Sequence, residues 1–445
     1  MSERVLIIGS GAREHAIAAA LARSPQPKEL FCFGSAHNPG IAALTSAYTT
    51  GNINNPAAVT NFAAHQQATL AIIGPENPLA AGVADALWAA GIPTVGPTAT
   101  LARLESSKAF TRSLLQKYKI PGNPFFRRFT SMEGVEQTLL TYANRHVIKD
   151  DGLAGGKGVK VSGDHLLSHT ESLSFAEELV ALNHPFVIEE KLEGQEFSLI
   201  SFSDGVTLRH MPLVQDHKRA YEGDLGPNTG GMGTYTDANH RLPFINAADL
   251  AAAASINERT VAAAQKETGT PYRGILYGGF MCTRDGVRLI EYNARFGDPE
   301  CLNLLTLLES DFLAICRAIV EGTLSTVDVR FAPLASVCKY VVPEGYPDAP
   351  RKGDIVTLPT SLPAGVTTYL GAVDLILVHQ GEAQLISTGS RTVAVVATAP
   401  TIAEAEQTCE SVIVQIPGPF FHRKDIGTAP LLHTRIEHMR TLRSK

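Results

Sequence analysis

The sequence predicts an α/β protein of several domains, and two changes of pattern along its 445 residues support this prediction. The first hundred residues alternate short apolar runs with helical stretches, which is typical of βαβ units and of a parallel sheet covered by helices. The middle of the chain is richer in hairpin signals, and the part after about residue 330 is rich in strands. A chain of this length is expected to form more than one domain.

The first part is predicted as alternating strands and helices. RVLIIG (4–9) is a short apolar run that ends in glycine, as buried parallel strands often do. A glycine turn then opens a helix over 9–24. Further strands are expected at 28–34 and 69–76, a helix at 78–91, and IPTVG (92–96) closes the unit.

The middle and last parts are predicted from turns and apolar runs. A helix over 101–122 is expected to end at Pro121, and Asp-Gly turns predict hairpins over 196–213 and 278–293. We place the boundaries between the parts near Leu104 and Arg330. The other expected elements are strands around a glycine-rich loop at 145–161, a helix at 171–182, strands at 186–192, 336–342, 366–371, 384–389 and 391–399, and a helix at 401–416.

Composition excludes several classes of protein. The net charge of −6 argues against a nucleic-acid partner bound through bulk positive charge. No run of 18 apolar residues without charge or turn residues is present, so we expect no membrane span and no membrane partner. The six cysteines are scattered without a C-x-x-C pair, which favours reduced, buried thiols in a cytoplasmic protein.

Two familiar nucleotide motifs do not fit. A P-loop needs a hydroxyl residue after its lysine, but Lys157 is followed by glycine, and Asp151 stands where the first glycine belongs. The dinucleotide pattern is half met by Gly9 and Gly11, but Glu14 occupies its third position, where glycine permits close helix–strand packing. This turn remains suited to some other anion at a helix N-terminus.

The glycine-rich segment DDGLAGGKGV (150–159) lies between two expected strands. Its backbone amides are suited to closing over a triphosphate, with Lys149 and Lys157 supplying positive charge. An ordinary flexible hairpin loop explains a lone glycine cluster equally well. The segment alone does not decide between these interpretations.

Residues downstream favour the phosphate interpretation. Glu291 and Asn293 are two apart on an expected strand and so face the same way. A carboxylate and an amide oxygen suit Mg²⁺, which is usually held by one or two carboxylates together with substrate phosphates. Arg295 follows and is suited to gripping phosphate or carboxylate. A surface carboxylate on a hairpin is the alternative for Glu291 alone.

The segment VIEEKLEGQEFSL (187–199) is the third candidate part of a nucleotide site. An edge strand offers backbone N–H and C=O groups to an adenine, and Glu196 is placed to accept hydrogen bonds from ribose hydroxyls. A plain exposed strand and turn remains the alternative when the segment is taken by itself.

In this order, the motifs resemble those of the ATP-grasp ligases. The segments that carry this resemblance are SSKAF (106–110), VIKDDGLAGGKGV (147–159), VIEEKLEGQEFSL (187–199) and IEYNARFGDPE (290–300). Further long segments resemble the glycinamide ribonucleotide synthetase family within that superfamily. They are 5–21, 72–110, 213–235, 272–281 and RKDIG (423–427), and together they span nearly the whole chain.

This resemblance implies an architecture and a reaction. The architecture is a Rossmann-like pre-ATP-grasp domain (1–103), a two-subdomain ATP-grasp domain (104–330, with a flap subdomain at about 122–191) and a C-terminal β-rich domain (331–445). The implied small-molecule partners are ATP, glycine and 5-phosphoribosylamine, with Mg²⁺ or Mn²⁺ as cofactor. ATP would phosphorylate the glycine carboxylate, and the amine of phosphoribosylamine would attack the acyl phosphate. A monomer or weak homodimer is expected.

The resemblance also implies roles for individual residues. Glu291 and Asn293 would hold the metal, and Arg295, Lys149 and Asp216 would act in catalysis. ATP would be bound by Lys108, Lys149, Gly155, Gly156, Lys157, Gly158, Glu189, Glu190, Leu192 and Glu196. The other substrates would be bound by Gly9, Ser10, Gly11, Glu76, Asp216, Lys218, Arg219, Asn228, Gly230, Gly231 and Arg295. His15 and His217 are candidate bases, but an isolated histidine is as often a structural hydrogen-bonding residue.

The chain departs from the usual family pattern at four places: Ala12, the loop around His37, Asp150 and Cys301. Asp150 adds negative charge near the expected phosphates, which weakens ATP binding unless that charge is paired. Three other functions remain as alternatives. They are another ATP-grasp carboxylate–amine ligase, a catalytically silent nucleotide-binding regulator, and a nicotinamide oxidoreductase, the last disfavoured by the failed dinucleotide pattern.

Overall fold

The computed structural model describes residues 2–143, 145–153, 158–377 and 383–444. Its first unit is a parallel five-stranded sheet in the order β3-β2-β1-β4-β5. The strands are β1 (Glu3–Ile8), β2 (Lys28–Gly34), β3 (Ala47–Thr50), β4 (Leu70–Ile73) and β5 (Thr94–Val95). The helices are α1 (Ala12–Ala22), α2 (Pro39–Ala42), α3 (Pro56–His65), α4 (Glu76–Ala80) and α5 (Val83–Ala89). This unit confirms the alternating pattern read from the sequence.

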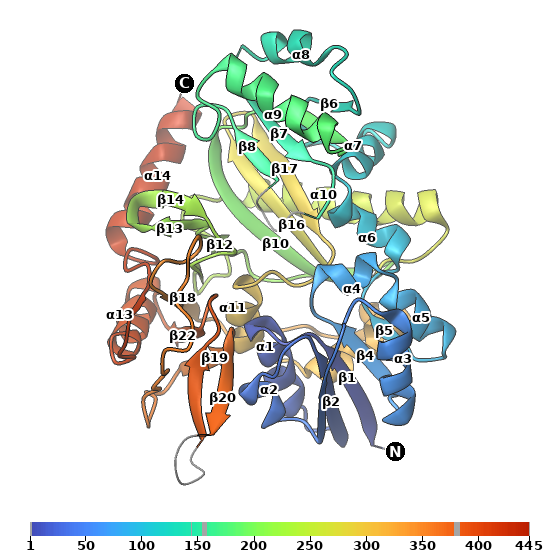
Figure 1. Ribbon diagram of the computed structural model, residues 1–445, viewed down its shortest axis with the longest axis vertical. Helices are drawn as coiled ribbons and strands as arrows, with labels where there is room; N and C mark the ends of the chain where they lie inside the picture. Colours follow the sequence, from blue (N-terminus) through green and yellow to red (C-terminus); the bar gives the residue numbers. More distant parts are fainter. Residues whose placement is uncertain (1, 144, 154–157, 378–382, 445) are drawn as a thin grey trace.

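The middle of the chain forms two sheets joined through helices. A long antiparallel sheet, β11-β10-β16-β17, lies beside a smaller sheet, β6-β9-β7-β8, which carries α8 and α9 at the top of Figure 1. The strands are β6 (Phe126–Phe129), β7 (His146–Asp150), β8 (Val159–Val161), β9 (Phe186–Glu190), β10 (Gly194–Asp204), β11 (Leu208–His210), β16 (Arg273–Thr283) and β17 (Gly286–Asn293). The helices are α6 (Ala99–Ser106), α7 (Lys108–Lys117), α8 (Val135–Thr141), α9 (His169–Ala181), α10 (Ala247–Thr268), α11 (Glu300–Leu307) and α12 (Phe312–Glu321). The two predicted Asp-Gly hairpins are confirmed as β10–β11 and β16–β17.

The third unit is a mixed layer of strands and two helices. Its main sheet has the order β12-β15-β18-β22-β19, so two strands from the middle of the chain complete a sheet built mostly by the C-terminal part. The strands are β12 (Gln215–Asp216), β13 (Arg219–Tyr221), β14 (Leu225–Asn228), β15 (Gly233–Thr236), β18 (Ala335–Pro343), β19 (Val366–Leu370), β20 (Val373–Leu377), β21 (Ala383–Ser387), β22 (Val393–Ala399) and β23 (Phe420–Phe421). The helices are α13 (Ile402–Ile413) and α14 (Ala429–Ser444), and short 3₁₀ turns lie at Glu222–Asp224 and Leu324–Thr326.

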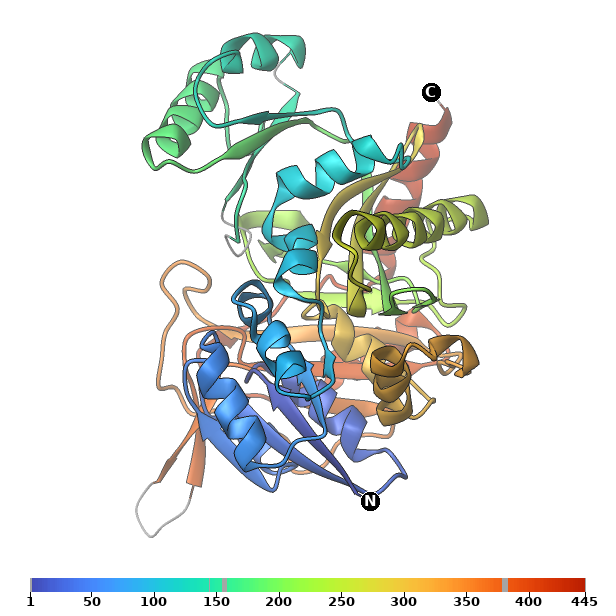
Figure 2. The same cartoon turned by 90° about the vertical axis from the view of Figure 1, so that its right-hand side faces the viewer.

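The three units pack closely. Figures 1 and 2 place the parallel sheet at one end of the molecule, the sheet with α8 and α9 at the other, and β10, β16 and β17 between them. Phe197 and Phe280 stack across β10 and β16 in a core that continues into the first and third units. All six cysteines are free and buried, as expected. In the described ranges no helix has both the length and the apolar character needed to cross a membrane.

Two predictions about helices were wrong. The stretch 78–91 forms α4 and α5 rather than one helix, because Gly82 takes a left-handed conformation (φ +81°) between them. The stretch 101–122 is likewise interrupted at Ser107, whose extended backbone and side chain cap α7 through the N–H of Phe110. The helices that were not predicted from the sequence are α2, α3, α8, α10, α11, α12 and α14.

We predict that Gly82→Ala lowers the free energy of unfolding by about 1 kcal/mol, because a Cβ disfavours the left-handed backbone. Gly82→Asn is the matched control, since asparagine tolerates this conformation and serves well before a helix. Urea unfolding monitored by circular dichroism measures both variants. Equal losses for alanine and asparagine would contradict the backbone explanation.

Candidate active site

The glycine turn after β1 is filled by a carboxylate of the chain itself. The N–H of Gly11 donates to Glu14 Oε2 at 2.6 Å, and Arg13 pairs with Glu14 Oε1 at 2.5 Å. A Cβ on Gly74 would lie 2.0 Å from Glu14 Oε1, so β4 passes tightly against this side chain. Glu14 therefore stands where a dinucleotide fold keeps a glycine, as the failed sequence pattern indicates. Ser10 faces the next strand end and bonds Ser35 across 3.1 Å.

Arg295 joins the strand β17 to the first unit. Its Nε donates to Glu76 Oε2 at 3.2 Å, and its Nη2 lies 3.0 Å from Glu105 Oε1. Burial favours the neutral form of Glu76, but the charges of Arg295 and Arg13 outweigh it and lower the pKa of Glu76. For Glu105 burial dominates and raises the pKa. The predicted substrate residues Glu76 and Arg295 are thus in direct contact.

Glu291 and Asn293 lie two residues apart at the end of β17, opposite Gly279 and Tyr277 of β16. Burial would raise the pKa of Glu291, but three lysines, Lys218 first among them, outweigh burial and lower it. Glu291 is therefore ionised at neutral pH and faces an excess of positive charge. An ionised carboxylate and an amide oxygen on one face of a strand fit the donor set that Mg²⁺ prefers.

Glu189 forms a buried ionic cluster with Arg112 and Lys149. Arg112 binds both carboxylate oxygens, at 2.7 and 2.9 Å, and Lys149 lies 2.7 Å from Oε2. Burial would raise the pKa of Glu189, but the two cations lower it to about 2. Burial lowers the pKa of Lys149, opposed by Glu189. Arg112 and Lys149 also donate to the carbonyl of Ile290, directly before the metal-ligand candidate on β17.

The glycine-rich loop is attached to helix α7. The carboxylate of Asp151 accepts from the N–H of Ala109 at 2.9 Å and from Ser107 Oγ at 3.0 Å, and Lys108 donates to the carbonyl of Gly152. The predicted phosphate residues Gly155, Gly156 and Lys157 lie outside the described residues. Gly158 ends the loop, and its carbonyl accepts from the N–H of Asp150.

Asp150 has a hydrogen-bonding partner. Its Oδ2 lies 3.0 Å from His184 Nδ1, and this imidazole compensates the carboxylate charge only when it is protonated. The weakening of ATP binding by Asp150 therefore stays a prediction.

The expected adenine edge lies between β9 and β10. The N–H of Phe125 donates to Glu190 Oε1 at 3.0 Å, so this side chain closes onto the segment before β6. Leu192 is half-buried in the connection that follows. Glu196 lies on β10 and its Oε2 is 3.4 Å from Lys218 Nζ, and Lys218 Nζ is also 3.9 Å from Glu291. Lys218 thus links the expected ribose and metal residues.

Asp216 lies on β12, near the buried carboxylate of Glu300. A small cavity is lined by Glu196, Phe197, Ser198, Asp216, Lys218, Tyr277, Gly279, Phe280, Ile290 and Glu291. Tyr277 donates to Glu300 Oε1 at 2.9 Å at the rear of this cavity. Burial, and then the nearby Glu300 carboxylate, raise the pKa of Asp216, while Lys218 opposes the rise. The cavity therefore brings together candidate residues for the metal (Glu291), the ribose (Glu196) and glycine (Asp216). The positive charge of Lys218 lies close to the negative charges of Glu196 and Glu291.

Other predicted substrate residues are divided between two places. Gly231 lies against Asp216, because a Cβ there would stand 2.7 Å from Asp216 Oδ1. Arg219 and Asn228 instead face each other on the two-stranded ribbon β13–β14, and Arg219 donates to the carbonyl of Gly226. Neither residue lines the cavity. The fold therefore brings Asp216, Lys218 and the turn at Gly231 together, whereas the β13–β14 ribbon lies outside the cavity.

Both candidate histidine bases have structural contacts. His15 Nδ1 accepts from the N–H of Leu370 at 2.9 Å, and burial lowers the pKa of His15 to about 4. His217 Nδ1 bonds the carbonyl of Gly233, and burial, with nearby Arg423, lowers its pKa to about 3. The imidazole of His15 therefore joins α1 to β19, and that of His217 joins the residue after β12 to β15.

The sequence analysis did not single out several residues that shape this site. They are Arg13, Glu105, Arg112, Tyr277, Glu300 and Arg391. Each lies inside an ordinary helix, strand or turn pattern, so no local signal marks it. Glu105 and Arg112 fall in one helical stretch beside SSKAF, and only the resemblance of that segment pointed to the region.

The fold, with its lysines and acids gathered at the strand ends, is that of an ATP-grasp ligase. Comparisons with known proteins agree. Models of phosphoribosylglycinamide synthetase match the chain with their N domain (residues 3–105), ATP-grasp (A) domain (106–301) and C domain (336–429). The chain belongs to the phosphoribosylglycinamide synthetase family.

Relatives cover the whole chain. The phosphoribosylamine–glycine ligase of Methanosarcina acetivorans is 45% identical over 443 residues, covering 100% of this chain and 98% of the relative. That of Methanothermobacter thermautotrophicus is 45% identical over 451 residues, covering 99% and 100%. The solved phosphoribosylamine–glycine ligase of Thermotoga maritima is 28% identical with a TM-score of 0.80, covering 95% and 100%. A biotin carboxylase domain from Hydrogenobacter thermophilus shares the fold (TM-score 0.71, 15% identity, covering 99% and 94%).

Glu189→Gln is expected to lower the free energy of unfolding by about 3 kcal/mol at neutral pH, because two buried cations lose their carboxylate. The folded-state pKa of Glu189 is depressed from 4.5 to about 2, so its contribution is complete above about pH 5. The difference between wild type and variant should then shrink as the pH falls from 5 towards 2.

Chemical denaturation at a series of pH values measures this difference. Glu267→Gln serves as control, because Glu267 pairs with Lys117 at the surface and its loss should leave stability almost unchanged. A difference that grows as the pH falls would contradict the assigned role of Glu189.

Proposed function

We propose that this protein joins glycine to 5-phosphoribosylamine at the expense of ATP, giving glycinamide ribonucleotide, ADP and phosphate in purine biosynthesis. Membership of the phosphoribosylglycinamide synthetase family supports the reaction. The single structural observation that carries it is the cavity in which Asp216, Lys218 and Glu291 meet. A site for a cationic amino group there borders a site for a metal and phosphates, as ligation through an acyl phosphate requires.

ATP and its metal fit the residues at the ends of β9 and β17. We assign Glu291 and Asn293 as ligands of Mg²⁺ or Mn²⁺, which neutralises phosphate charge when bound. Lys108 and Lys149 would contact phosphate, with Gly155 to Gly158 closing over it. An ammonium group has three donors, and Glu189 and Ile290 account for two of those on Lys149. The adenine would lie along Glu189, Glu190 and Leu192, and the ribose at Glu196.

The other two substrates would approach from the opposite side of the cavity. Asp216 would bind the glycine ammonium, with the backbone of Gly230 and Gly231 beside it. Lys218 would contact the glycine carboxylate or its phosphate. Phosphoribosylamine would lie between the turn formed by Gly9, Ser10 and Gly11 and the side chain of Glu76, and Arg219 and Asn228 would border the entrance.

The reaction then takes two steps. A carboxylate oxygen of glycine forms a bond to the γ-phosphorus of ATP, and the bond to the β-phosphate oxygen breaks to release ADP. The nitrogen of phosphoribosylamine next attacks the acyl carbon, inorganic phosphate leaves, and the nitrogen loses a proton. No side-chain nucleophile is needed, because the substrate carboxylate takes that role. Arg295 would stabilise the transferring phosphoryl group, since Glu76 and Glu105 already fix its orientation.

We also propose the domain limits 1–103, 104–330 and 331–445, a cytoplasmic location, and function as a monomer or weak homodimer. The two small strands β12 and β15 cross the second limit, since they belong by sequence to the middle part and by pairing to the last. With these limits, the segment that contains Asp216 and Gly231 would be shared between two domains.

The experiment that tests this function measures phosphate release from ATP and Mg²⁺ with glycine and fresh phosphoribosylamine, supplied singly and together. Release that needs both, with an equal amount of glycinamide ribonucleotide, is the expected result. ATP binding without turnover would exclude this substrate pair and favour a different acid and amine on the same scaffold.

Glu291→Gln should reduce kcat/KM by at least about 100-fold and raise the Mg²⁺ concentration needed for half-maximal rate, because a charged metal ligand is lost. A magnesium titration of the initial rate measures both quantities. The control is Glu258→Gln, at an exposed side chain of α10 that pairs only with His210 in the described contacts. Unchanged magnesium dependence in Glu291→Gln would remove Glu291 from the metal site.

Asp216→Asn should raise the KM for glycine about 10- to 100-fold and leave the KM for ATP within twofold, because the amide no longer attracts the ammonium group. Initial rates at varied glycine and ATP decide this. Asp285→Asn, in the exposed turn between β16 and β17, is the control. An equal rise in both constants would contradict a role specific to glycine.

A further inference from the structure

Arginines of the C-terminal part contact the segment from Asp216 to Gly231, here called the substrate segment. Arg391 binds its turn at Gly230 and Gly231, and Arg423, together with Arg435, binds its ribbon β13–β14. No role was predicted for these arginines from the sequence, although RKDIG (423–427) was among the segments that marked the family resemblance. The C-terminal part otherwise contributes no assigned substrate contact.

Arg391 binds the turn formed by Gly230 and Gly231. Its Nη1 donates to the carbonyl of Gly230 at 2.6 Å and to that of Gly231 at 3.2 Å. The same guanidinium donates to the carbonyl of Asp298 at 2.7 Å and pairs with its carboxylate at 3.1 Å. Arg391 also lies over the ring of Tyr340, 4.8 Å from its centroid. One side chain therefore joins the wall beside Asp216 to the turn that leads into Glu300.

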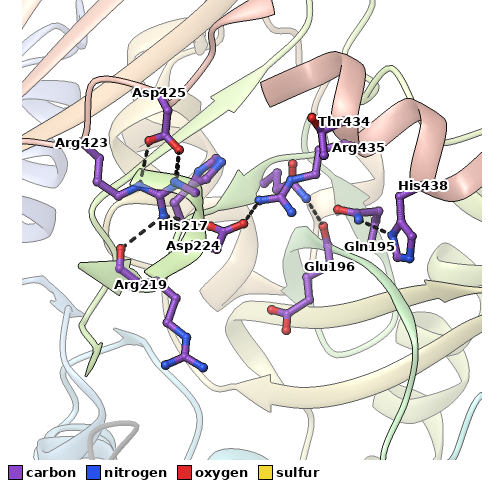
Figure 3. Close-up of polar contacts among 12 residues, drawn as sticks. Gln195, Glu196, His217, Arg219, Asp224, Arg423, Asp425, Thr434, Arg435 and His438 are labelled. Atoms are coloured by element: carbon purple, nitrogen blue, oxygen red, sulfur yellow. Dashed lines mark hydrogen bonds and ion pairs between the residues drawn. The ribbon is translucent and has the colours of Figure 1, made fainter. Parts of the chain in front are cut away.

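Arg423 holds the ribbon end. It is 1% exposed, and it pairs with Asp224 at 2.9 Å and with Asp425 at 2.6 Å. Its Nη1 also donates to the carbonyl of Arg219, and Asp425 accepts from the N–H of Gly223. Figure 3 shows Arg423 between the two aspartates, with Arg435 of α14 reaching Asp224 from the other side.

We infer that Arg391 and Arg423 are positioning residues for substrate binding, and that the C-terminal part sets the geometry of the glycine site through them. Neither side chain lines the cavity. Each acts through backbone carbonyls and carboxylates of the substrate segment. A planar guanidinium that serves several acceptors at fixed angles cannot be replaced by an ammonium group, so even lysine loses this function.

This inference rests on the proposed function for its kinetic consequence. Loosening the substrate segment moves Asp216, Gly230 and Gly231, whereas Glu189 and Glu190 on β9 keep contacts outside the segment. Lys218 belongs to the segment, but its contacts with Glu196 and Glu291 are long, at 3.4 and 3.9 Å. The effect should therefore fall mainly on glycine. Hydrogen bonds inside the segment, such as that from the N–H of Thr229 to the carbonyl of Lys218, should open more often.

The test uses the full-length protein with Arg391→Lys and Arg423→Lys, and with Asp224→Asn as a milder variant at a partly exposed partner. Val395→Ala is the matched control, because it opens a cavity in β22 of the same unit without touching the substrate segment. For each protein we would measure the melting temperature, amide hydrogen exchange over residues 222–233, and the KM values for glycine and ATP.

We expect the arginine variants to exchange at least tenfold faster over 222–233, to raise the KM for glycine at least tenfold, and to keep the KM for ATP within twofold. Asp224→Asn should change in the same direction, and Val395→Ala should lower only the melting temperature. Unchanged exchange in the variants would overturn the inference, as would parallel increases in both KM values. Exchange needs no turnover, so failure of wild type to make product would refute the proposed function separately.

Discussion

The carboxylate of Glu189 is the interaction on which the nucleotide site depends. It is 2% exposed and binds Arg112 of α7 and Lys149 of β7, while both cations also bond the backbone just before Glu291. One buried charge therefore joins the small sheet, α7 and β17, the strand that carries the proposed metal ligands Glu291 and Asn293. A buried acid with a single cation would be costly, but two cations and carbonyl acceptors leave each charged group satisfied.

On the other side of the site, charged groups are likewise held between opposite charges. Arg295 stands between Glu76 and Glu105, and Lys218 between Glu196 and Glu291. Arg295 joins the end of β17 to the first unit through Glu76, and Lys218 joins the segment after β12 to β10 and β17. Charges that a phosphoryl transfer needs are thus held in place by opposite charges of neighbouring units, so the site needs little rearrangement when negative substrates arrive.

Much of the fold and part of the candidate site could be predicted from the sequence, because the patterns involved extend over only a few residues. The strands with alternating or apolar runs and the Asp-Gly hairpins depend on neighbours a few residues away, and Glu291 and Asn293 share a face because strands repeat every two residues. Gly82 and Ser107 divide two stretches that were each predicted as one helix. The division was missed because the amino-acid sequence alone does not distinguish a left-handed glycine or a capping serine from ordinary helix residues. Glu189 lies 40 and 77 positions from Lys149 and Arg112, Arg391 lies 161 positions from Gly230, and Arg423 lies 199 positions from Asp224, beyond any local pattern.

We propose that Glu291 and Asn293 hold the metal while Asp216 holds glycine in the cavity that Glu291 also lines. A crystal structure with Mn²⁺, a non-hydrolysable ATP analogue and glycine tests this arrangement, because the anomalous signal locates the metal. We expect manganese between Glu291, Asn293 and the phosphates, with the glycine ammonium at Asp216. Manganese bound away from β17, or glycine whose ammonium is turned from Asp216, would contradict it.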